Sequence, residues 1–366
     1  AATIRLLSTV IIVFFFVFYV GAQFAGAGKT IFVTFGIDPF WGQIVACAVI
    51  LAYATFGGFV SVVAVDAFQA ILMIATLVVT PIVMLVKVAA GPVSLSQALA
   101  AAGPGVDSWT GGAGGFAAGL LIFNHFAWFF GYLGGQPQLS VRFMAIRDPG
   151  QARKGRNIGI AWTLIAYIGA LSIGWIGLAL FGPGGLKDPE YVMPAVILKL
   201  FPPAIAAVLI MGAIAAMIST ADSLLILSAG ELSENIIKPL VNRNWACRAG
   251  SSVQACAAGE AGGNERDSGR GGRDLALSRL VTGALAAVAL ALAYLFPSTL
   301  IYTMVSYVWA GIGGTFSVVI LLTLFWKRYS GKAALVTIAA GMLFTIAWIA
   351  TGMDRVVTAR PMTFLV

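Results

Sequence analysis

Nine stretches of about 20 mostly apolar residues follow one another along this 366-residue chain. A helix of about 20 residues is long enough to cross the hydrocarbon core of a bilayer. The chain is 60% hydrophobic and only 10% charged, which leaves too few charges for a soluble surface. We therefore predict an all-α polytopic membrane protein with about nine transmembrane helices. They lie near residues 6–27, 41–62, 67–89, 114–136, 157–181, 203–229, 277–296, 301–326 and 333–352.

The basic residues predict how these helices are oriented. If the chain starts inside the cell, 16 of its 22 Lys and Arg residues fall in the N-terminus and the cytoplasmic connections. Such a bias is typical of multi-pass proteins, whose basic loops stay on the cytoplasmic side. It also accounts for the net charge of +8 through contacts with anionic lipid. We therefore expect a multi-pass protein of the cell membrane, with the lipid bilayer and no nucleic acid as a partner.

Two parts of the chain differ from the apolar runs. Residues 242–274 are rich in Gly, Ala, Ser and Arg, which predicts a flexible cytoplasmic loop. The chain begins with Ala1 rather than Met, as expected for an internal piece of a longer protein. We therefore interpret residues 1–366 as a single transmembrane domain, present as a fragment.

Polar residues inside the apolar runs are the first candidates for a site, because such groups are costly in lipid. The run 203–229 contains Ser219, Thr220, Asp222 and Ser223 after two turns of small residues. Adjacent hydroxyls are hard oxygen ligands, which suit Na⁺ when backbone carbonyls complete the shell. The alternative is that these hydroxyls bond only to their own helix.

The run 114–136 carries a second group of polar and aromatic residues. Asn124, Trp128 and Tyr132 share one helical face, and a Gly-Gly-Gln-Pro segment follows at 134–137. Gly and Pro weaken a helix, and irregular backbone at membrane depth is tolerated where it lines a cavity or is buried in protein. These residues fit the wall of a solute site; the alternative is an aromatic belt at the membrane surface.

Asp66 lies between two apolar runs at the predicted cytoplasmic end. Two roles remain open for it: an N-cap of the following helix, or attraction and release of a cation at the cytoplasmic mouth. The sequence has one His and three Cys, and no nucleophile–base set or cluster of metal ligands is recognisable. We therefore expect no enzyme activity and no cofactor.

Four motifs together resemble a known family. They span Tyr53–Gln69, Gly131–Ala145, Ile218–Leu225 and Ser306–Arg328, in this order. This combination resembles the sodium:solute symporter family, and most closely its sodium/proline symporters. The resemblance covers about residues 6 to 350, with the loop 242–274 left out.

The resemblance implies the inverted-repeat fold of the bacterial leucine transporter, with two five-helix repeats. By this comparison the chain contains the third to tenth core helices and one additional helix. The first two core helices are missing, and we expect them to precede Ala1. Because the family holds sodium between its first and eighth core helices, residues 1–366 alone are not expected to transport.

The same resemblance implies the site residues. Sodium is expected at the carbonyl of Ala216 and the hydroxyls of Ser219 and Thr220, and sodium entry and release at Asp66. The implied substrate-binding residues are Trp128, Tyr132, Pro137 and, more loosely, Tyr19. The pair Gly134–Gly135 has one glycine more than the common pattern, so the register of Trp128 and Tyr132 is open by one residue.

The function implied is secondary active transport, in which Na⁺ entry drives uptake of a small solute, with L-proline as the expected solute. Two alternatives stay open. The same machinery could carry another amino acid, a carboxylate or pantothenate. The chain could also be a transporter-like sensory module.

Overall fold

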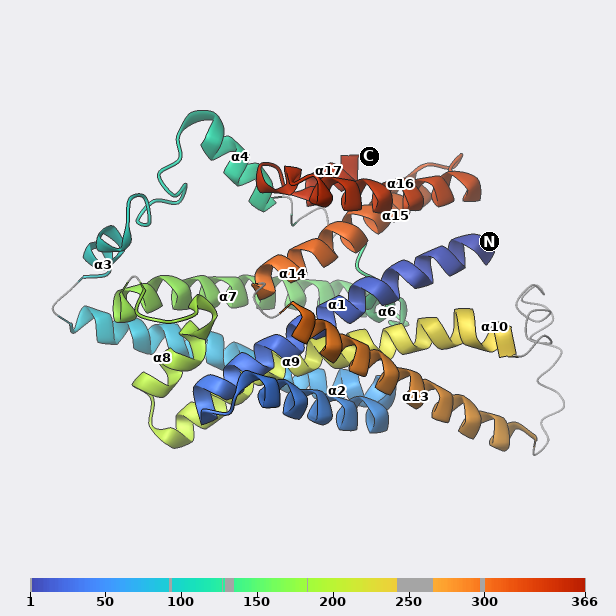
Figure 1. Cartoon of the computed structure of the whole chain (residues 1–366), viewed down its shortest axis with the longest axis horizontal. Coiled ribbons are helices and arrows are strands. Elements are labelled where there is room, and N and C mark those ends of the chain that lie inside the picture. Colours follow the sequence, from blue (N-terminus) through green and yellow to red (C-terminus); the bar gives the residue numbers. More distant parts are fainter. Residues whose placement is uncertain are drawn as a thin grey trace.

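The computed structural model describes residues 2–91, 94–126, 128, 135–182, 184–241, 266–296 and 300–365. Helices account for nearly all of this part of the chain, and it contains no strand (Figure 1). The helical elements are α1 (Ala2–Phe35), α2 (Pro39–Ala89), α3 (Leu95–Ala102), α4 (Gly115–Phe126), α6 (Pro137–Met144), α7 (Pro149–Phe181), η1 (Pro189–Tyr191), α8 (Val192–Leu200), α9 (Pro203–Leu232), η2 (Ser233–Ile237), α10 (Lys238–Val241), α13 (Arg266–Leu295), α14 (Ile301–Val308), η4 (Trp309–Gly314), α15 (Thr315–Phe325), α16 (Gly331–Ala350), η5 (Met353–Arg355) and α17 (Ala359–Leu365).

Seven helices within the described residues are long and apolar enough to cross a membrane. They confirm the predicted all-α membrane fold. Two further predicted runs, near 41–62 and 114–136, correspond to the shorter apolar helices Pro39–Ala52 and Gly115–Phe126. Many large apolar side chains of these helices are exposed on the outside of the bundle, among them Ile158, Leu164 and Ile168 of α7. Such a surface suits contact with lipid.

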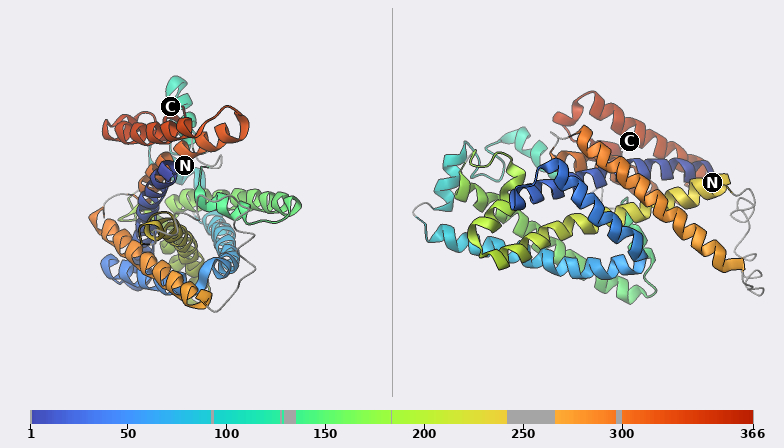
Figure 2. Two further views of the ribbon diagram at one scale, coloured as in Figure 1. Left: turned by 90° about the vertical axis from the view of Figure 1, so that its right-hand side faces the viewer. Right: turned by 60° about the horizontal axis from the view of Figure 1, so that its bottom comes forward.

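Helix α2 is 51 residues long, about 76 Å at 1.5 Å per residue, which is far more than one membrane crossing needs. In Figure 2 its two halves, Pro39–Ala52 and Val62–Ala89, diverge from a bend. Because the helix continues through this region, Asp66 lies inside α2. The expectation that Asp66 caps the start of a helix is therefore wrong.

Helices α1 and α9 form the centre of the bundle (Figure 1). The largest core cluster joins apolar residues of α1 to those of α9, α13 and η4, and includes Phe16, Leu224, Ala289 and Ile312. Small residues bring the helix backbones close together. A Cβ atom at Gly21 of α1, for example, would lie 2.9 Å from the carbonyl oxygen of Ala289. Close approach of this kind gains van der Waals contact where lipid removes the hydrophobic driving force between helices.

The loop expected at 242–274 is only partly described. Residues 242–265 lie outside the described residues. Residues 266–274 form the first turns of α13, so the helix extends beyond its apolar stretch at this end.

A charged cluster joins three elements at the end of the bundle that the basic residues predict to be extracellular. Lys29 of α1 donates to Asp188 at 2.7 Å and to Glu190 at 2.5 Å. Glu190 also accepts from the backbone N–H of Ile301, the first residue of α14, at 2.8 Å. The cluster therefore ties the connection before α8 to both α1 and α14.

We expect Lys29→Met to lower the free energy of unfolding by about 1–3 kcal/mol, because it leaves two carboxylates without their shared cation. Thermal unfolding of the purified protein in detergent measures this. Lys332→Met, at an exposed lysine of α16, is the matched control and should shift the melting temperature little. Equal effects of the two variants would contradict a structural role for the cluster.

The same cluster predicts a dependence on pH. Partial burial alone would raise the pKa of the Asp188 carboxyl, but the hydrogen bonds from Lys29 and from the Glu190 backbone, with the Lys29 charge, outweigh it and lower this pKa. A carboxyl with a lowered folded pKa stabilises the fold above its unfolded value near 4. The stabilisation is therefore complete at neutral pH and decreases as pH falls below about 4. In the Lys29→Met variant, the loss of stability below about pH 4 that comes from Asp188 should be smaller.

Candidate functional site

The hydroxyls of Ser219 and Thr220 lie in the middle of α9. This helix starts with Pro203 in its first turn, where proline is tolerated, and continues through a series of small and apolar residues. The Ser219 hydroxyl donates to the carbonyl oxygen of Ala216 at 3.1 Å, and the Thr220 hydroxyl donates to the same oxygen at 2.9 Å. Both hydroxyl oxygens keep lone pairs that can accept a cation. The three groups therefore form one compact set of oxygens.

A cavity of about 620 Å³ lies beside these hydroxyls. It brings together Tyr19 of α1, Asp66 of α2, and Ser219 and Thr220 of α9, which the sequence predicted as site residues. Residues of α6, α7 and η4 complete its wall, including Trp162, Tyr167 and Trp309. Four predicted site residues from three helices thus share one cavity.

Asp66 forms an ion pair with Arg142 across this cavity. An Arg142 Nη2–Asp66 Oδ2 distance of 2.5 Å joins the two side chains, and Arg142 also donates to the Ser223 hydroxyl at 2.7 Å. Ser223 in turn donates to the carbonyl oxygen of Ser219 at 2.8 Å. The Oδ1 atom of Asp66 is buried and has no hydrogen-bond partner within the described residues. A chain of polar contacts therefore runs from Arg142 to the candidate cation ligands.

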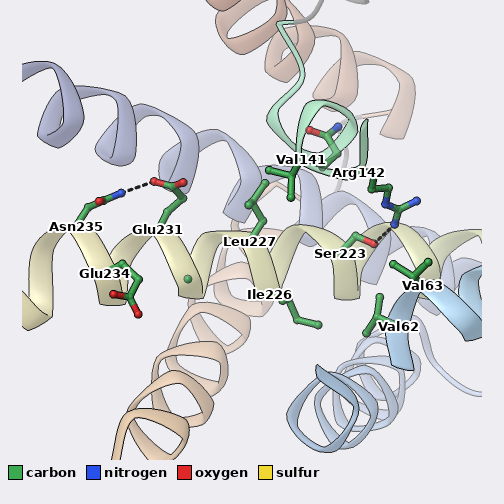
Figure 3. Close-up of a pocket in the computed structure, with 12 residues that line it drawn as sticks. Val62, Val63, Val141, Arg142, Ser223, Ile226, Leu227, Glu231, Glu234 and Asn235 are labelled. Carbon is green, nitrogen blue, oxygen red and sulfur yellow. Dashed lines mark hydrogen bonds between the residues drawn. The ribbon is translucent and has the colours of Figure 1, made fainter. Parts of the chain in front are cut away.

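A second cavity, of about 320 Å³, lies beside Arg142 and Ser223 (Figure 3). Both cavities are lined by Gln138, Arg142 and Ser223, so these residues lie at their common boundary. Further along α9 the second cavity is lined by Glu231 and Asn235, which are hydrogen-bonded to each other. It leads toward the end of the bundle that the basic residues predict to be cytoplasmic.

Asp222 is the most buried acid near the site. Its side chain has no exposed surface, and its Oδ2 atom has no hydrogen-bond partner in the described part of the chain. Its Oδ1 atom accepts from the Ser223 hydroxyl at 3.4 Å. With Asp66 and Arg142 nearby, the site holds two carboxyl groups and one guanidinium group.

The predicted aromatic residues are placed differently. Trp128 does not line the 620 Å³ cavity; its ring packs edge-on against Trp309, with the ring centres 5.5 Å apart, and Trp309 lines that cavity. Tyr132 lies outside the described residues. Pro137 starts α6, where a proline at the first position suits the helix geometry. Pro137 lines neither cavity, whereas Gln138 and Arg142 of the same helix line both.

Arg142 and Ser223 are functional candidates in the structure that are not among the site residues predicted from the sequence. In the sequence, Arg142 is only one of the basic residues that predict the orientation of the helices. It sits in the last turn of α6, where a basic side chain complements the helix dipole. Ser223 was part of the polar group in α9, and its spacing of four residues from Ser219 places both on one helical face. That spacing could have identified Ser223 as a site residue from the sequence.

The arrangement suits a monovalent hard cation and a small polar solute. Hydroxyl, carbonyl and carboxylate oxygens are the ligands that such cations prefer. Within the described residues no group of three His, Cys, Asp or Glu side chains could hold a transition metal. A cavity with a cluster of polar groups on an otherwise apolar wall, inside a bundle of apolar helices, is the architecture of a secondary transporter.

Comparison with known proteins identifies the class. The family model for the sodium:solute symporter family matches residues 1–248 and 266–341. The chain therefore belongs to the sodium:solute symporter family. Members of this family are membrane transporters, not enzymes, and the chain is a multi-pass protein of the cell membrane.

Curated relatives are about 30% identical. The high-affinity proline transporter PutP of Bacillus subtilis is 32% identical over 353 residues, covering 96% of this chain and 68% of the relative. The osmoregulated proline transporter OpuE of the same species is 30% identical, with 97% and 66% covered. Sodium/proline symporter 2 of Staphylococcus saprophyticus is 30% identical, with 94% and 62% covered. The chain thus spans about two thirds of the length of these relatives.

A solved structure shows the same fold. The outward-open, substrate-bound state of a Na⁺-coupled sialic acid symporter superimposes with a TM-score of 0.69 at 17% identity. The match covers all of this chain and 73% of that structure. It confirms the leucine-transporter-like bundle that the motifs predicted.

Proposed function

We propose that this protein couples the downhill entry of Na⁺ to the uptake of L-proline across the cell membrane. The observation that carries the proposal is the shared cavity that brings Ser219 and Thr220 next to Asp66. Family membership supports the coupling ion, and the proline transporters among the relatives support the solute.

The proposed sodium ligands are the Ser219 and Thr220 hydroxyls with the carbonyl of Ala216. In the structure these hydroxyls bond back to Ala216, as the alternative interpretation of the sequence expected. They also face the cavity, so back-bonding and ion binding are compatible. A bound cation takes hydroxyl lone pairs without removing the hydroxyls from their helix.

Asp66 is the proposed residue for sodium entry and release, with Arg142 as its partner between transport events. A sodium ion near Asp66 competes with the Arg142 guanidinium for the same carboxylate oxygen. Since Arg142 lines both cavities, its movement would change the connection between them. Binding of ion and solute is coupled if both favour the same state of this connection.

The driving force is sufficient for uphill uptake. Moving one positive charge inward through the membrane potential yields about 2.3 kcal/mol per 100 mV, before the sodium concentration gradient is added. Each 1.4 kcal/mol supports a tenfold concentration ratio of the solute. One Na⁺ per solute would therefore support an inside-to-outside ratio of at least about 40 at 100 mV.

Uptake of labelled L-proline into proteoliposomes that contain the protein at its full natural length tests the proposal. We expect uptake under an inward Na⁺ gradient and none when choline replaces Na⁺. Other amino acids, carboxylates and pantothenate serve as competitors. If one of these solutes competes for uptake and unlabelled proline does not, that solute replaces proline as the proposed substrate. Absence of sodium-dependent uptake of every solute, with retained solute binding, would favour the sensory module.

A further inference from the structure

A buried arginine lies behind the aromatic wall of the cavity. Arg360 of α17 is only 4% exposed, and its guanidinium carbon lies 4.0 Å from the centre of the Trp128 ring. Stacking on tryptophan is a favourable position for a guanidinium group. It places a permanent positive charge in the apolar part of the bundle.

The charge of Arg360 is not matched by a hydrogen-bonded carboxylate among the described residues. Its Nε and Nη1 atoms are buried and have no acceptor there. Tyr302 forms a side-chain hydrogen bond with the guanidinium and also accepts from Trp128 Nε1 at 3.3 Å, but a hydroxyl group is not a carboxylate counter-ion. Asp354 acts only through its charge, since its Oδ1 accepts from the Ala359 backbone N–H at 2.6 Å. A buried cation with unused donors is costly unless an anion joins it.

The position of Arg360 is fixed by contacts around it. The hydroxyls of Thr345 and Thr363 lie 2.7 Å apart, which ties α17 to α16. The Asn124 side chain accepts from the Thr358 backbone N–H and donates to the Val356 carbonyl, each at 3.0 Å, so the segment before α17 is held against α4. Contacts with α16 and with α4 therefore hold α17, and with it Arg360, in place.

Arg360 is also close to the candidate solute site. Trp128 packs against Trp309, and Trp309 lines the 620 Å³ cavity. Two aromatic side chains, Trp128 and then Trp309, thus separate the guanidinium from the cavity, and contact between Arg360 and a solute requires both to move aside. Trp128 is one of the four residues for which the family resemblance implies substrate binding.

We propose that Arg360 binds the carboxylate group of the transported solute. Its unused N–H groups lie in the plane of the guanidinium, away from the stacked Trp128 ring, and supply the charged hydrogen bonds that a carboxylate needs. The ligand is a small molecule with a free carboxylate, such as an amino acid. This proposal rests on the proposed function, because it uses the same cavity and the same solute.

The test compares L-proline with L-prolinamide, which has the same ring but no carboxylate charge. Equilibrium binding of both is measured in Na⁺ with the protein at its full natural length. Arg360→Gln should weaken proline binding by about 10- to 100-fold, the usual effect of losing a hydrogen bond to a charged group. Prolinamide binding should change by less than about twofold, so the preference for proline collapses.

Two further variants accompany Arg360→Gln. Arg328→Gln removes an exposed arginine after α15 and should leave the preference unchanged. Arg360→Lys keeps the charge and should retain part of the preference, which separates loss of recognition from loss of folding. If Arg360→Gln and Arg360→Lys weaken proline and prolinamide equally, or neither at all, Arg360 only packs and the proposal is wrong.

The proposed function can fail separately. If the unmodified protein binds neither compound in Na⁺, the proposed solute is wrong and the role of Arg360 falls with it. If it binds proline but the Arg360 variants keep the preference, the proposed function stands and only the role of Arg360 is rejected.

Discussion

Replacing Ser219 and Thr220 together with alanine will abolish sodium-dependent uptake while the protein stays folded. Each hydroxyl is a proposed ligand of the ion, and groups that contact a charge contribute about 1.5–3 kcal/mol each. Loss of both should lower the apparent Na⁺ affinity by at least about 100-fold. Asp66 and Ser223 remain at the cavity, but they bond to Arg142 and cannot restore the paired hydroxyls beside the Ala216 carbonyl.

The fold should tolerate this change. Both hydroxyls donate only to the carbonyl of Ala216 in their own helix, a contact that adds little to helix stability. Alanine is also the stronger helix former. We therefore expect the melting temperature without sodium to remain within a few degrees of that of the unmodified protein.

The measurement is the Na⁺ dependence of proline uptake in proteoliposomes, with the melting temperature determined in parallel. The matched control is Ser172→Ala with Thr323→Ala, which removes one serine and one threonine hydroxyl that bond back to Ile168 and Val319. These two residues do not line either cavity of the site. Unchanged Na⁺ dependence in the Ser219 and Thr220 variant would exclude the proposed ion site.

The amino-acid sequence predicted the membrane fold because apolar runs of membrane length are a local property. It also predicted Ser219 and Thr220, since neighbouring hydroxyls in a small-residue helix form a local pattern. Asp66 is predicted for the same reason, as an acid at the end of an apolar run, and its role in sodium entry and release stays a prediction. Asp66 is not an N-cap, because helix α2 continues through residue 66. The sequence shows two apolar runs that meet here, and a helix can continue from one run into the next.

The remaining parts of the site depend on contacts between distant residues. Arg142 and Asp66 form an ion pair although they are 76 positions apart in the sequence. Arg360 of α17 stacks on Trp128, which is also far from it in the sequence. Hydropathy assigns both arginines to loops or helix ends, where basic residues are ordinary. Only the packing of α6 and α17 reveals that one pairs with an acid and the other is buried with unused donors.

The crossing of α9 with α2 leads to the second large prediction. Gly212 of α9 faces Leu72 and Thr76 of α2, and a Cβ atom at Gly212 would lie 2.2 Å from Thr76 Oγ1 and 2.7 Å from the Leu72 carbonyl oxygen. Thr76 is fixed there, because its hydroxyl donates to the carbonyls of Leu72 and Leu209, each at 3.0 Å. Any side chain at position 212 must therefore push the two helices apart.

We expect Gly212→Leu to destabilise the protein by about 3 kcal/mol or more, and to prevent recovery of a folded, monodisperse protein in detergent. Size-exclusion chromatography and thermal unfolding measure this. Gly283→Leu is the control, because a Cβ atom at Gly283 of α13 meets no atom within 4 Å. A stable Gly212→Leu protein would show that α2 and α9 do not pack as described.

The smaller variant Gly212→Ala connects this crossing to transport. Gly212 and Ser219 lie seven residues apart on one face of α9, and Asp66 lies on α2 near the same crossing. Separation of the two helices by even a few tenths of an ångström lengthens the contacts between Ser223 and Asp66, now 3.4 Å apart. Gly212→Ala should therefore lower the apparent Na⁺ affinity of uptake while folded protein is still obtained. An unchanged Na⁺ affinity together with a lowered melting temperature would mean that the crossing supports the fold but does not set the geometry of the ion site.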